Sequence, residues 1–360
     1  MSKWKIGIVG LRRGRSFVNV LGAHSRIEVA ALCDVDPAPL DELGEAFALG
    51  SERRFTDFAG FLAADIDVVI VATPIALHAD QTVRALEAGK HVLCEQTAAY
   101  TVADCRAVVD AVRRTGMKYM MAENYAYYHY VRQWKRRIDQ GQLGTIFYAE
   151  GEYVHEIIDL LVDPETGDYH WRHERPPIWY CAHCLGPLLT LMGDRVVAAC
   201  GAHAGFHRRP DQADHPGFLD MEVALFRTAG GALIKVLRSQ VAPRYPHLVW
   251  YCLYGTKGYV ENGRGRGPGQ LWTDAEMTPD DEARDIDCPK ADPDAPPGAA
   301  AGGHGTSEYD LIRDFLDALD RDADPPIDAV RAMDFTVPGL IAHQSAMTDG
   351  NWREVPLMDA

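Results

Sequence analysis

The stretch Lys5-Ile-Gly-Ile-Val-Gly-Leu-Arg-Arg-Gly-Arg15 decides the fold class, because an apolar run passes through Gly10 directly into a helical pattern. A glycine at the end of a strand permits a tight turn, which lets backbone N–H groups at a helix N-terminus approach a pyrophosphate. Gly10 matches the first glycine of the dinucleotide pattern Gly-x-Gly-x-x-Gly, whereas Arg12 and Arg15 replace the other two. We interpret the turn as a dinucleotide site in which Arg12 and Arg13 neutralise phosphate. The alternative is an exposed basic turn.

An acidic residue after the second apolar run supports this interpretation. Residues 28–34 end in Asp34, about twenty residues beyond the turn, where an acid binds the ribose hydroxyls and repels a 2′-phosphate. Asp34 therefore favours NAD over NADP as the cofactor. Its competing role is that of a turn acid at the end of the strand, before Asp36 and Pro37.

The first 123 residues alternate strand-like runs with helical patterns, which is typical of βαβ units and a parallel sheet. Thr101 and Gly116 are the expected N-cap and C-terminal glycine of one helix. The other expected helix covers 78–88, and the expected strands cover 5–10, 28–34, 67–72, 91–94 and 118–122. We predict a Rossmann domain with a doubly wound parallel sheet at residues 1–123.

Beyond residue 123 strands follow one another, which indicates a mostly antiparallel, open sheet in an α+β domain. A helix is expected at 128–139 and strands at 145–155, 221–226, 232–239 and 248–254. Residues 263–305 are rich in Gly, Pro and Asp and are predicted to form a long loop. Ser307 is predicted to begin the final amphipathic helix, which Pro325 and Pro326 end. We assign residues 124–360 to a second domain for substrate binding and oligomerisation.

Composition excludes several classes of protein. The 36 Lys and Arg against 52 Asp and Glu give a formal charge of −16, which argues against a nucleic-acid partner because phosphate binding requires clustered cations. No apolar run approaches the ~20 residues of a membrane span, and the early strand leaves no room for a signal peptide. We therefore expect a cytoplasmic protein that binds no membrane. The eight cysteines are interpreted as packing, and no metal is expected because Cys181-x-x-Cys184 lacks a second ligand pair.

Two motifs of the first domain resemble those of a known family. They are Thr73-Pro74-Ile-Ala-Leu-His78 after the third strand and Ala85-Leu-Glu-Ala-Gly-Lys-His-Val-Leu-Cys-Glu95 over the next helix and strand. Here the chain resembles the glucose–fructose oxidoreductase and inositol dehydrogenase (Gfo/Idh/MocA) family. The resemblance implies a Rossmann domain followed by an α/β domain with an open sheet, a nicotinamide cofactor and usually a sugar or cyclitol substrate.

Two departures from that family concern its catalytic groups. The family's Glu-Lys-Pro lysine, which orients the substrate hydroxyl and assists proton transfer, falls on Gln96, and the proline falls on Thr97. The aspartate that commonly stands four residues before the substrate-domain histidine falls on Trp179. Because an amide cannot act as a titrating base or a cation, the ordinary dehydrogenase machinery is incomplete.

A narrower resemblance rests on motifs that recur in a fixed order. They are Met120-Met-Ala-Glu-Asn-Tyr125, Gly141-Gln-Leu-Gly144, Glu150-Gly-Glu-Tyr-Val-His155, Trp171-Arg172, Tyr180-Cys-Ala-His-Cys-Leu-Gly-Pro187 and Gly303-His-Gly305. In these motifs the chain resembles the NAD-dependent α-N-acetylgalactosaminidases. That family oxidises C3 of the sugar, eliminates the aglycone, adds water and reduces the ketone again, without net redox change.

Proton transfer selects the catalytic candidates. Taking hydride from a secondary alcohol needs a base for the hydroxyl proton, and histidine titrates near neutral pH, which suggests His183. The narrower resemblance maps a Tyr-x-x-His motif onto Tyr180 and His183 and a strand tyrosine onto Tyr153. For Tyr180 and Tyr153 plain packing is the alternative, and for His183 a satisfied buried histidine. His155 lies two residues after Tyr153 on the same strand face and is a candidate ligand.

The remaining candidates follow from position. Glu95 ends a strand at the carboxyl edge of the sheet and is expected to touch the nicotinamide ribose or to hold its loop. The cofactor candidates are Gly10, Arg12, Arg13, Asp34, Thr73, Pro74, His78, Glu95, Gln96 and Asn124. The substrate candidates are Gln96, Tyr125, His155, Trp171, Arg172, Trp179 and His304, with aromatic core as the alternative for the tryptophans.

Three functions stay open. The leading one is an NAD-dependent oxidoreductase that moves hydride to or from a secondary alcohol carbon of a sugar-like substrate. The second is an NAD-dependent glycoside hydrolase that uses the same hydride step within an elimination cycle. The third is a non-catalytic sensor of NAD and sugar. In each case a homo-oligomer, a dimer or tetramer, is implied by the family resemblance.

Overall fold

The computed structural model describes residues 3–358, which divide into two compact units. The first unit combines the chain up to Tyr128 with Lys290–Met333, and the second combines His129–Pro289 with residues 334–358. Residues 290–333, which the sequence assigned to the second domain, therefore pack in the first unit. The reason is that their helix α8 (Ser307–Asp320) buries its apolar stripe against α1 (Leu11–Leu21) and the short helix Asn124–Tyr127. No helix among the described residues is long and apolar enough to cross a membrane.

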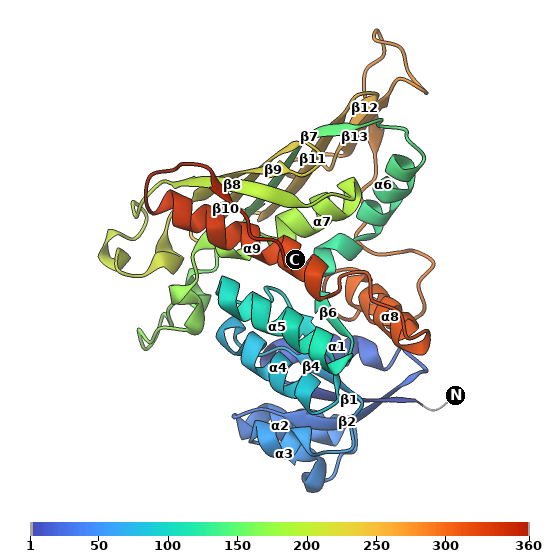
Figure 1. Ribbon diagram of the computed structural model, residues 1–360, viewed down its shortest axis with the longest axis vertical. Coiled ribbons are helices and arrows are strands. Elements are labelled where there is room, and N and C mark those ends of the chain that lie inside the picture. Colours follow the sequence, from blue (N-terminus) through green and yellow to red (C-terminus); the bar gives the residue numbers. More distant parts are fainter. Residues whose placement is uncertain (1–2, 359–360) are drawn as a thin grey trace. The chain divides into compact units, whose positions relative to one another are not determined.

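The first unit is built on a six-stranded sheet in the order β3-β2-β1-β4-β5-β6 (Figure 1). All of its pairings are parallel, which confirms the predicted doubly wound sheet. The strands are β1 (Trp4–Val9), β2 (Ile27–Cys33), β3 (Arg54–Phe55), β4 (Val68–Val71), β5 (His91–Glu95) and β6 (Tyr119–Ala122). Because β1 pairs with β2 on one side and β4 on the other, the strand order reverses at its carboxyl end. Ligands bind at such points in sheets of this kind.

The helices of this unit begin and end where local chemistry dictates. The Thr101 side chain accepts the N–H of Asp104 at 3.0 Å, and Gly116 ends the helix with a φ of 70°, as predicted. Figure 1 shows α4 and α5 side by side against the sheet. Besides α1 and α8, the helices are α2 (Pro37–Ala46), α3 (Phe58–Leu62), α4 (His78–Glu87) and α5 (Val102–Thr115).

The second unit holds a nine-stranded sheet in the order β14-β13-β12-β11-β7-β10-β9-β8-β15. Its pairings are antiparallel except for that of β10 with β7, so the predicted mostly antiparallel sheet is confirmed. The strands are β7 (Ile146–Val154), β8 (Val196–His203), β9 (Glu222–Thr228), β10 (Leu233–Ser239), β11 (Leu248–Gly255), β12 (Gly258–Glu261), β13 (Gly269–Thr273), β14 (Arg284–Ile286) and β15 (Arg353–Glu354).

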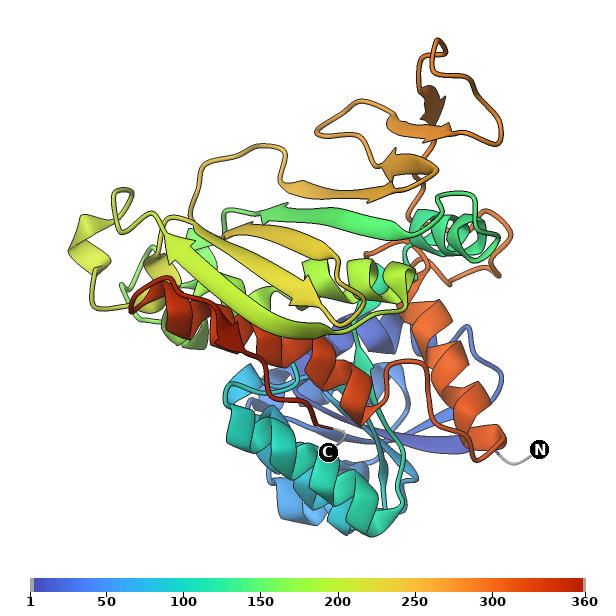
Figure 2. The ribbon, with the colours of Figure 1, turned by 45° about the horizontal axis from the view of Figure 1, so that its top comes forward.

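Helix α7 (Ala182–Met192) lies along one face of this sheet (Figure 2). A glycine makes the close approach possible, because a Cβ added at Gly151 of β7 would lie 2.8 Å from the Cβ of Cys184. Cys184 and Cys181 are buried and form no disulfide, which agrees with their interpretation as packing residues. The other helix ahead of the sheet, α6 (His129–Asp139), contacts α7.

Two predictions about the last third of the chain are wrong. A further helix, α9 (Ala329–Ala346), follows the two prolines that were expected to end the final helix. Its buried residues Phe335, Val337 and Leu340 lie on different sides, so no polar stripe reveals a helical period. The predicted loop 263–305 contains β13 and β14, which are too short to show a clear alternation.

Candidate active site

The first unit offers a cradle for a dinucleotide at the turn between β1 and α1. Gly10 adopts a φ of 86°, and a Cβ placed there would lie 2.6 Å from the backbone of Ala72 and Thr73. Glycine is therefore required for the close approach of the β1 and β4 ends. The first N–H groups of α1 then sit at the carboxyl edge of the sheet, where the chemistry of backbone donors fits a pyrophosphate.

Asp34 is anchored beside this turn. One carboxylate oxygen accepts the N–H of Leu11 at 2.6 Å, and the other accepts the N–H of Asp36 at 2.9 Å. The turn-acid role weighed for Asp34 is thus real, and it also holds the carboxylate at the start of α1. A ribose contact for Asp34 remains a prediction.

Two arginines of the turn behave differently. The Arg12 guanidinium is largely exposed and lies 3.3 Å from Asp36. Arg13 instead turns toward Glu95, which accepts its Nε at 2.6 Å, and also donates to the Ser16 hydroxyl at 2.9 Å. Arg13 therefore has a carboxylate partner that the sequence did not foresee, whereas the exposure of Arg12 is compatible with phosphate binding and with the alternative of an exposed basic turn.

The His78 side chain links two loops by hydrogen bonds. Its Nδ1 lies 2.8 Å from the carbonyl of Thr97 and its Nε2 lies 2.8 Å from that of Thr73, and the ring is fully buried. Burial by itself lowers the pKa of His78, but Cys94 and the two carbonyls outweigh it and raise the pKa to about 9. A doubly donating imidazolium is the form that satisfies both carbonyls. We conclude that His78 holds the Thr73-Pro74 turn in place.

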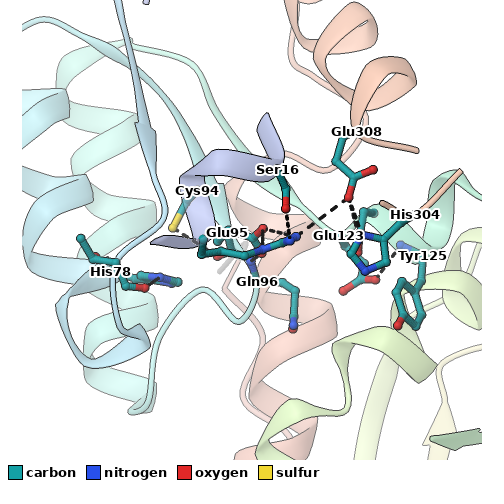
Figure 3. A network of polar contacts seen from close by, with 12 residues as sticks. Ser16, His78, Cys94, Glu95, Gln96, Glu123, Tyr125, His304 and Glu308 are labelled. Atoms are coloured by element: carbon teal, nitrogen blue, oxygen red, sulfur yellow. Dashed lines mark hydrogen bonds and ion pairs between the residues drawn. The ribbon is translucent and has the colours of Figure 1, made fainter. Parts of the chain in front are cut away.

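Gln96, at the family's lysine position, is buried at the end of β5. Its backbone N–H donates to Glu95 at 3.1 Å, and its side-chain oxygen accepts the Thr97 hydroxyl at 3.0 Å. Glu95 pairs with the Arg13 guanidinium, which also lies 4.0 Å from the carboxylate of Glu308 on α8. Figure 3 shows Glu95, Gln96 and Glu308 within this network of polar contacts. The amide therefore has a structural partner on its own strand end.

Two buried carboxylates complete this network, and neither was predicted. Glu308, on α8, accepts from His304 at 2.6 Å and from Asn124 at 3.1 Å. Burial acts to raise the pKa of Glu308, but the contact with His304 dominates and the pKa lies below its usual value. Burial raises the pKa of Glu123 to about 8, against the donation of the Tyr125 N–H. The pair of carboxylates is thus pushed toward opposite charge states (Figure 3).

The signal for these two residues in the sequence is weak. Glu123 stands directly before Asn124 and Tyr125, within the motif that carried the narrower resemblance. Glu308 lies in the first turn of α8, where acidic residues are common on any helix. Only the contact of α8 with the end of β6 makes either residue part of a site.

The second unit brings together the three predicted catalytic residues. Tyr153 comes from β7, Tyr180 from the short helix Pro177–Tyr180 and His183 from the first turn of α7. The ring centroid of His183 lies 5.5 Å from that of Tyr153 and 5.0 Å from that of Tyr180. The carbonyl of His183 accepts the hydroxyl of Tyr251, which fixes the start of α7 against β11. This is an arrangement that can hold and move protons.

His155 extends the cluster by a hydrogen bond. Its Nδ1 lies 3.0 Å from the hydroxyl of Tyr153. The pKa of His155 is lowered to about 4, first by burial and then by the positive potential of His247, Arg238 and His183. The ring is therefore neutral near pH 7 and remains a hydrogen-bonding partner rather than a cation.

Comparison with known proteins identifies the fold family of the first 123 residues. Residues 4–123 match the profile of an oxidoreductase family with an NAD-binding Rossmann fold, Gfo/Idh/MocA. Over these residues the chain is similar to the Gfo/Idh/MocA family. Its first unit is therefore an NAD-binding Rossmann domain.

Among the proteins similar to this chain are bacterial ones named as glycosyl hydrolases. A glycosyl hydrolase family 109 protein of Shewanella pealeana is 29% identical over 289 residues, which cover 72% of this chain and 63% of the relative. A glycosyl hydrolase family 109 protein of Shewanella baltica is 28% identical over 364 residues, which cover 88% of this chain and 78% of the relative. The chain therefore spans less than two thirds of the first relative's length.

The fold is shared with solved dehydrogenases. Levoglucosan dehydrogenase in complex with NADH and L-sorbose superposes with a TM-score of 0.84 at 21% identity, over 99% of this chain and 100% of the other. At this identity the likeness establishes the fold, including the second sheet.

Trp179, in the second unit, lies in a packing contact. Its ring packs edge-on against His343 at 5.7 Å, and His343 in turn is 2.7 Å from the carboxylate of Glu222. Trp179 is thus part of a packing contact with α9, whereas Trp171 carries the Arg172 guanidinium 4.3 Å above its ring. The two tryptophans, both substrate candidates with aromatic core as the alternative, thus have different neighbours.

Two buried arginines, Arg175 and Arg238, are the main residues that the sequence reasoning missed here. The guanidinium of Arg175 lies 3.9 Å from the ring centroid of Tyr180, and that of Arg238 lies 4.2 Å from the ring centroid of Tyr153. A signal for Arg238 existed, because alternation along its strand places it on the same face as Ile234 and Val236. For Arg175 the sequence offers no comparable pattern.

Across residues 3–358, no group of three or more His, Cys, Asp or Glu side chains is arranged to hold a metal ion.

Proposed function

We propose that this chain is an NAD-dependent oxidoreductase that moves hydride between the nicotinamide and a secondary alcohol carbon of a sugar or sugar-like substrate. The observation that carries the proposal is the cluster of His183, Tyr180 and Tyr153, in a chain whose first unit binds NAD. The redox chemistry is supplied by NAD when it is bound. The protein supplies proton transfer and orientation.

Each residue has a role in this proposal. His183 removes the hydroxyl proton as the general base, and Tyr180 and Tyr153 orient or assist. In the first unit the N–H groups after Gly10 hold the pyrophosphate, Arg12 adds charge, and Asp34 selects NAD over NADP. Glu95 would contact the nicotinamide ribose or hold its loop. The other substrate contacts proposed are Gln96, Tyr125, His155, Trp171, Arg172 and His304.

Turnover on a panel of pyranoses, cyclitols and anhydrosugars tests this function. We expect NADH absorbance to grow with at least one substrate, and His183→Asn to lower kcat by about 10²–10⁴-fold, the usual contribution of a general base. His203→Asn, at an exposed position on β8, is the control and should keep the full rate. An unchanged rate in His183→Asn would remove His183 from the mechanism, and turnover of any kind would exclude the sensor hypothesis.

A redox-neutral glycoside hydrolase is the second candidate. It is favoured by Gln96 and Trp179, which replace two groups of an ordinary dehydrogenase, and by relatives named glycosyl hydrolase family 109 proteins. This candidate predicts that an aryl glycoside is cleaved without net NADH and that the product carries deuterium at C2 when the reaction runs in deuterium oxide. Accumulating NADH without cleavage favours the oxidoreductase instead.

We also propose a cytoplasmic homo-oligomer, a dimer or tetramer, with no nucleic-acid partner. The formal charge of −16 supports the last point, because a polyanion would be repelled. Light scattering at micromolar concentration tests the assembly, and a monomer would contradict it.

A further inference from the structure

Arg238 is placed beneath Tyr153 by the register of the second sheet. Strands β7 and β10 pair in parallel with Arg238 directly opposite Tyr153, and β9 pairs with β10 so that Glu222 is the next neighbour in the same row. Residues that pair directly across strands point to the same face. The row Glu222, Arg238, Tyr153 therefore runs across three strands on one face.

In this row the carboxylate of Glu222 contacts groups other than Arg238. Glu222 accepts the N–H of Ile178 at 2.8 Å and contacts Nδ1 of His343 at 2.7 Å. Arg238 donates instead to the carbonyls of Tyr153 and Ser239, and its Nε is buried without a hydrogen-bond partner. Within residues 3–358, no carboxylate lies within ion-pair distance of Arg238.

Arg175, a neighbour of Arg238, is also a buried arginine without an ion-pair partner among the described residues. It is buried to the same degree, donates to the side chain of Gln240, and its Nε also lacks a partner. The described residues provide no ion-pair partner for it either. Two neighbouring guanidinium groups are thus removed from water without a counter-charge, which is a costly arrangement unless a nearby group becomes an anion.

The groups that can become anions here are few. The charged and titratable side chains around Tyr153 and its neighbours Tyr180, His155 and Arg238 come from five elements and the segments beside them: His155, Arg238, Arg175, Tyr180, His183, Cys184, His247 and Glu222. The guanidinium groups lie directly over the faces of Tyr153 and Tyr180, the geometry in which a cation is attracted by an aromatic ring and more so by a phenolate. His155, kept neutral, can donate a hydrogen bond to the same phenolic oxygen.

We propose that Arg238, supported by Arg175, is a positioning residue that holds Tyr153 as a phenolate and thereby makes it a proton acceptor of the site. When Tyr153 ionises, its proton is released to water. In the reaction His183 removes the hydroxyl proton and passes it on to the phenolate oxygen: the substrate O–H bond breaks, its electron pair stays on the substrate oxygen, and an O–H bond forms on Tyr153. This inference rests on the proposed function for its substrate, but the charge state of Tyr153 does not depend on it.

Titration of the protein without substrate tests the charge state. We expect the phenolate absorbance of about one tyrosine to develop at a lower pH than that of the rest, since an opposite charge within ~4–6 Å shifts a titration by about 1–3 units. Tyr148 is a contrast on the same strand, because burial and the neighbouring Glu150 raise the pKa of Tyr148 to about 12. The early phase should vanish in Tyr153→Phe and persist in Tyr180→Phe.

Substitution of the arginine separates charge from packing. Arg238→Met fills similar volume without charge and should move the early phase up by about 1–3 pH units, whereas Arg238→Lys should restore most of it. Arg227→Met is the matched control, because the Arg227 guanidinium lies over Trp352 and not over a tyrosine. Thermal melts verify that each variant folds, and Arg175→Met provides a second test if Arg238→Met does not.

The outcomes are distinct. An early phase that survives Tyr153→Phe, or that stays at the same pH in both folded arginine variants, overturns the inference. A lack of turnover on every sugar would refute the proposed function and leave this titration unaffected. Where turnover is found, the acidic limb of the kcat profile should move in Arg238→Met as the titration does.

Discussion

Replacing Gly10 by alanine tests whether the turn before α1 is built for a close backbone approach. The added Cβ would lie 2.6 Å from the carbonyl carbon and oxygen of Ala72, on a backbone with a φ of 86°. A positive φ costs an L-residue roughly 1–2 kcal/mol, and crowding of a packed site costs about 1–3 kcal/mol more. We therefore expect Gly10→Ala to lower the free energy of unfolding by about 2–5 kcal/mol.

Gly116→Ala is the matched control for this prediction. Gly116 also has a positive φ, of 70°, but no atom lies within 4 Å of the position of its Cβ. The control should cost only the conformational part, roughly 1–2 kcal/mol. Urea unfolding followed by tryptophan fluorescence measures both variants. Equal losses of stability would show that crowding by β4 plays no part, and the reasoning would be refuted.

Binding of NAD gives an independent readout of the same change. The backbone must shift to relieve the overlap with Ala72, so the donors of the first turn of α1 move from the pyrophosphate. A loss of about 1.4 kcal/mol corresponds to a tenfold weaker Kd, and we expect at least that much for Gly10→Ala by calorimetric titration. Gly116 precedes β6 at the opposite, amino end of the sheet, so its variant should bind NAD normally.

Two further predictions concern acids of the first unit. Asp34→Ser keeps an acceptor near the Leu11 N–H but removes the negative charge, so the Kd ratio of NADP to NAD should fall by about tenfold or more; an unchanged ratio excludes Asp34 from cofactor selection. The pKa of Glu123 is raised to about 8 in the folded protein. The free energy of unfolding therefore falls as the pH rises from about 4.5 toward 8, because over this range the unfolded chain loses the Glu123 proton while the folded protein keeps it. Glu123→Gln should therefore exceed the wild type in stability near pH 8 by on the order of 2–4 kcal/mol, with the gain shrinking toward pH 5 in denaturant titrations.

Local chemistry was sufficient to predict the parallel sheet and much of the antiparallel one. Apolar runs, Thr101 and Gly116 act within a few residues of themselves, so their consequences can be read from adjacent positions. Helix α9 was not predicted because it is buried on every side and therefore lacks the polar stripe on which helix prediction depends. The place of the segment 290–333 in the first unit was not predicted, because the residues against which it packs lie far away in the sequence.

The candidate site also contains residues that the sequence predicted and contacts that only the tertiary structure shows. The motifs named Tyr153, Tyr180 and His183, and Gly10 and Asp34, because each stands in a short pattern with a recognisable chemical purpose. Tertiary structure alone decided that Arg13 meets Glu95, that Glu308 joins Asn124 and His304, and that Arg238 lies beneath Tyr153. Arg238 and Tyr153 are 85 positions apart, and their contact exists because two strands pair in one register. The charge of a buried side chain depends on such neighbours, and neighbours of this kind are set by the fold and not by the chain around the residue.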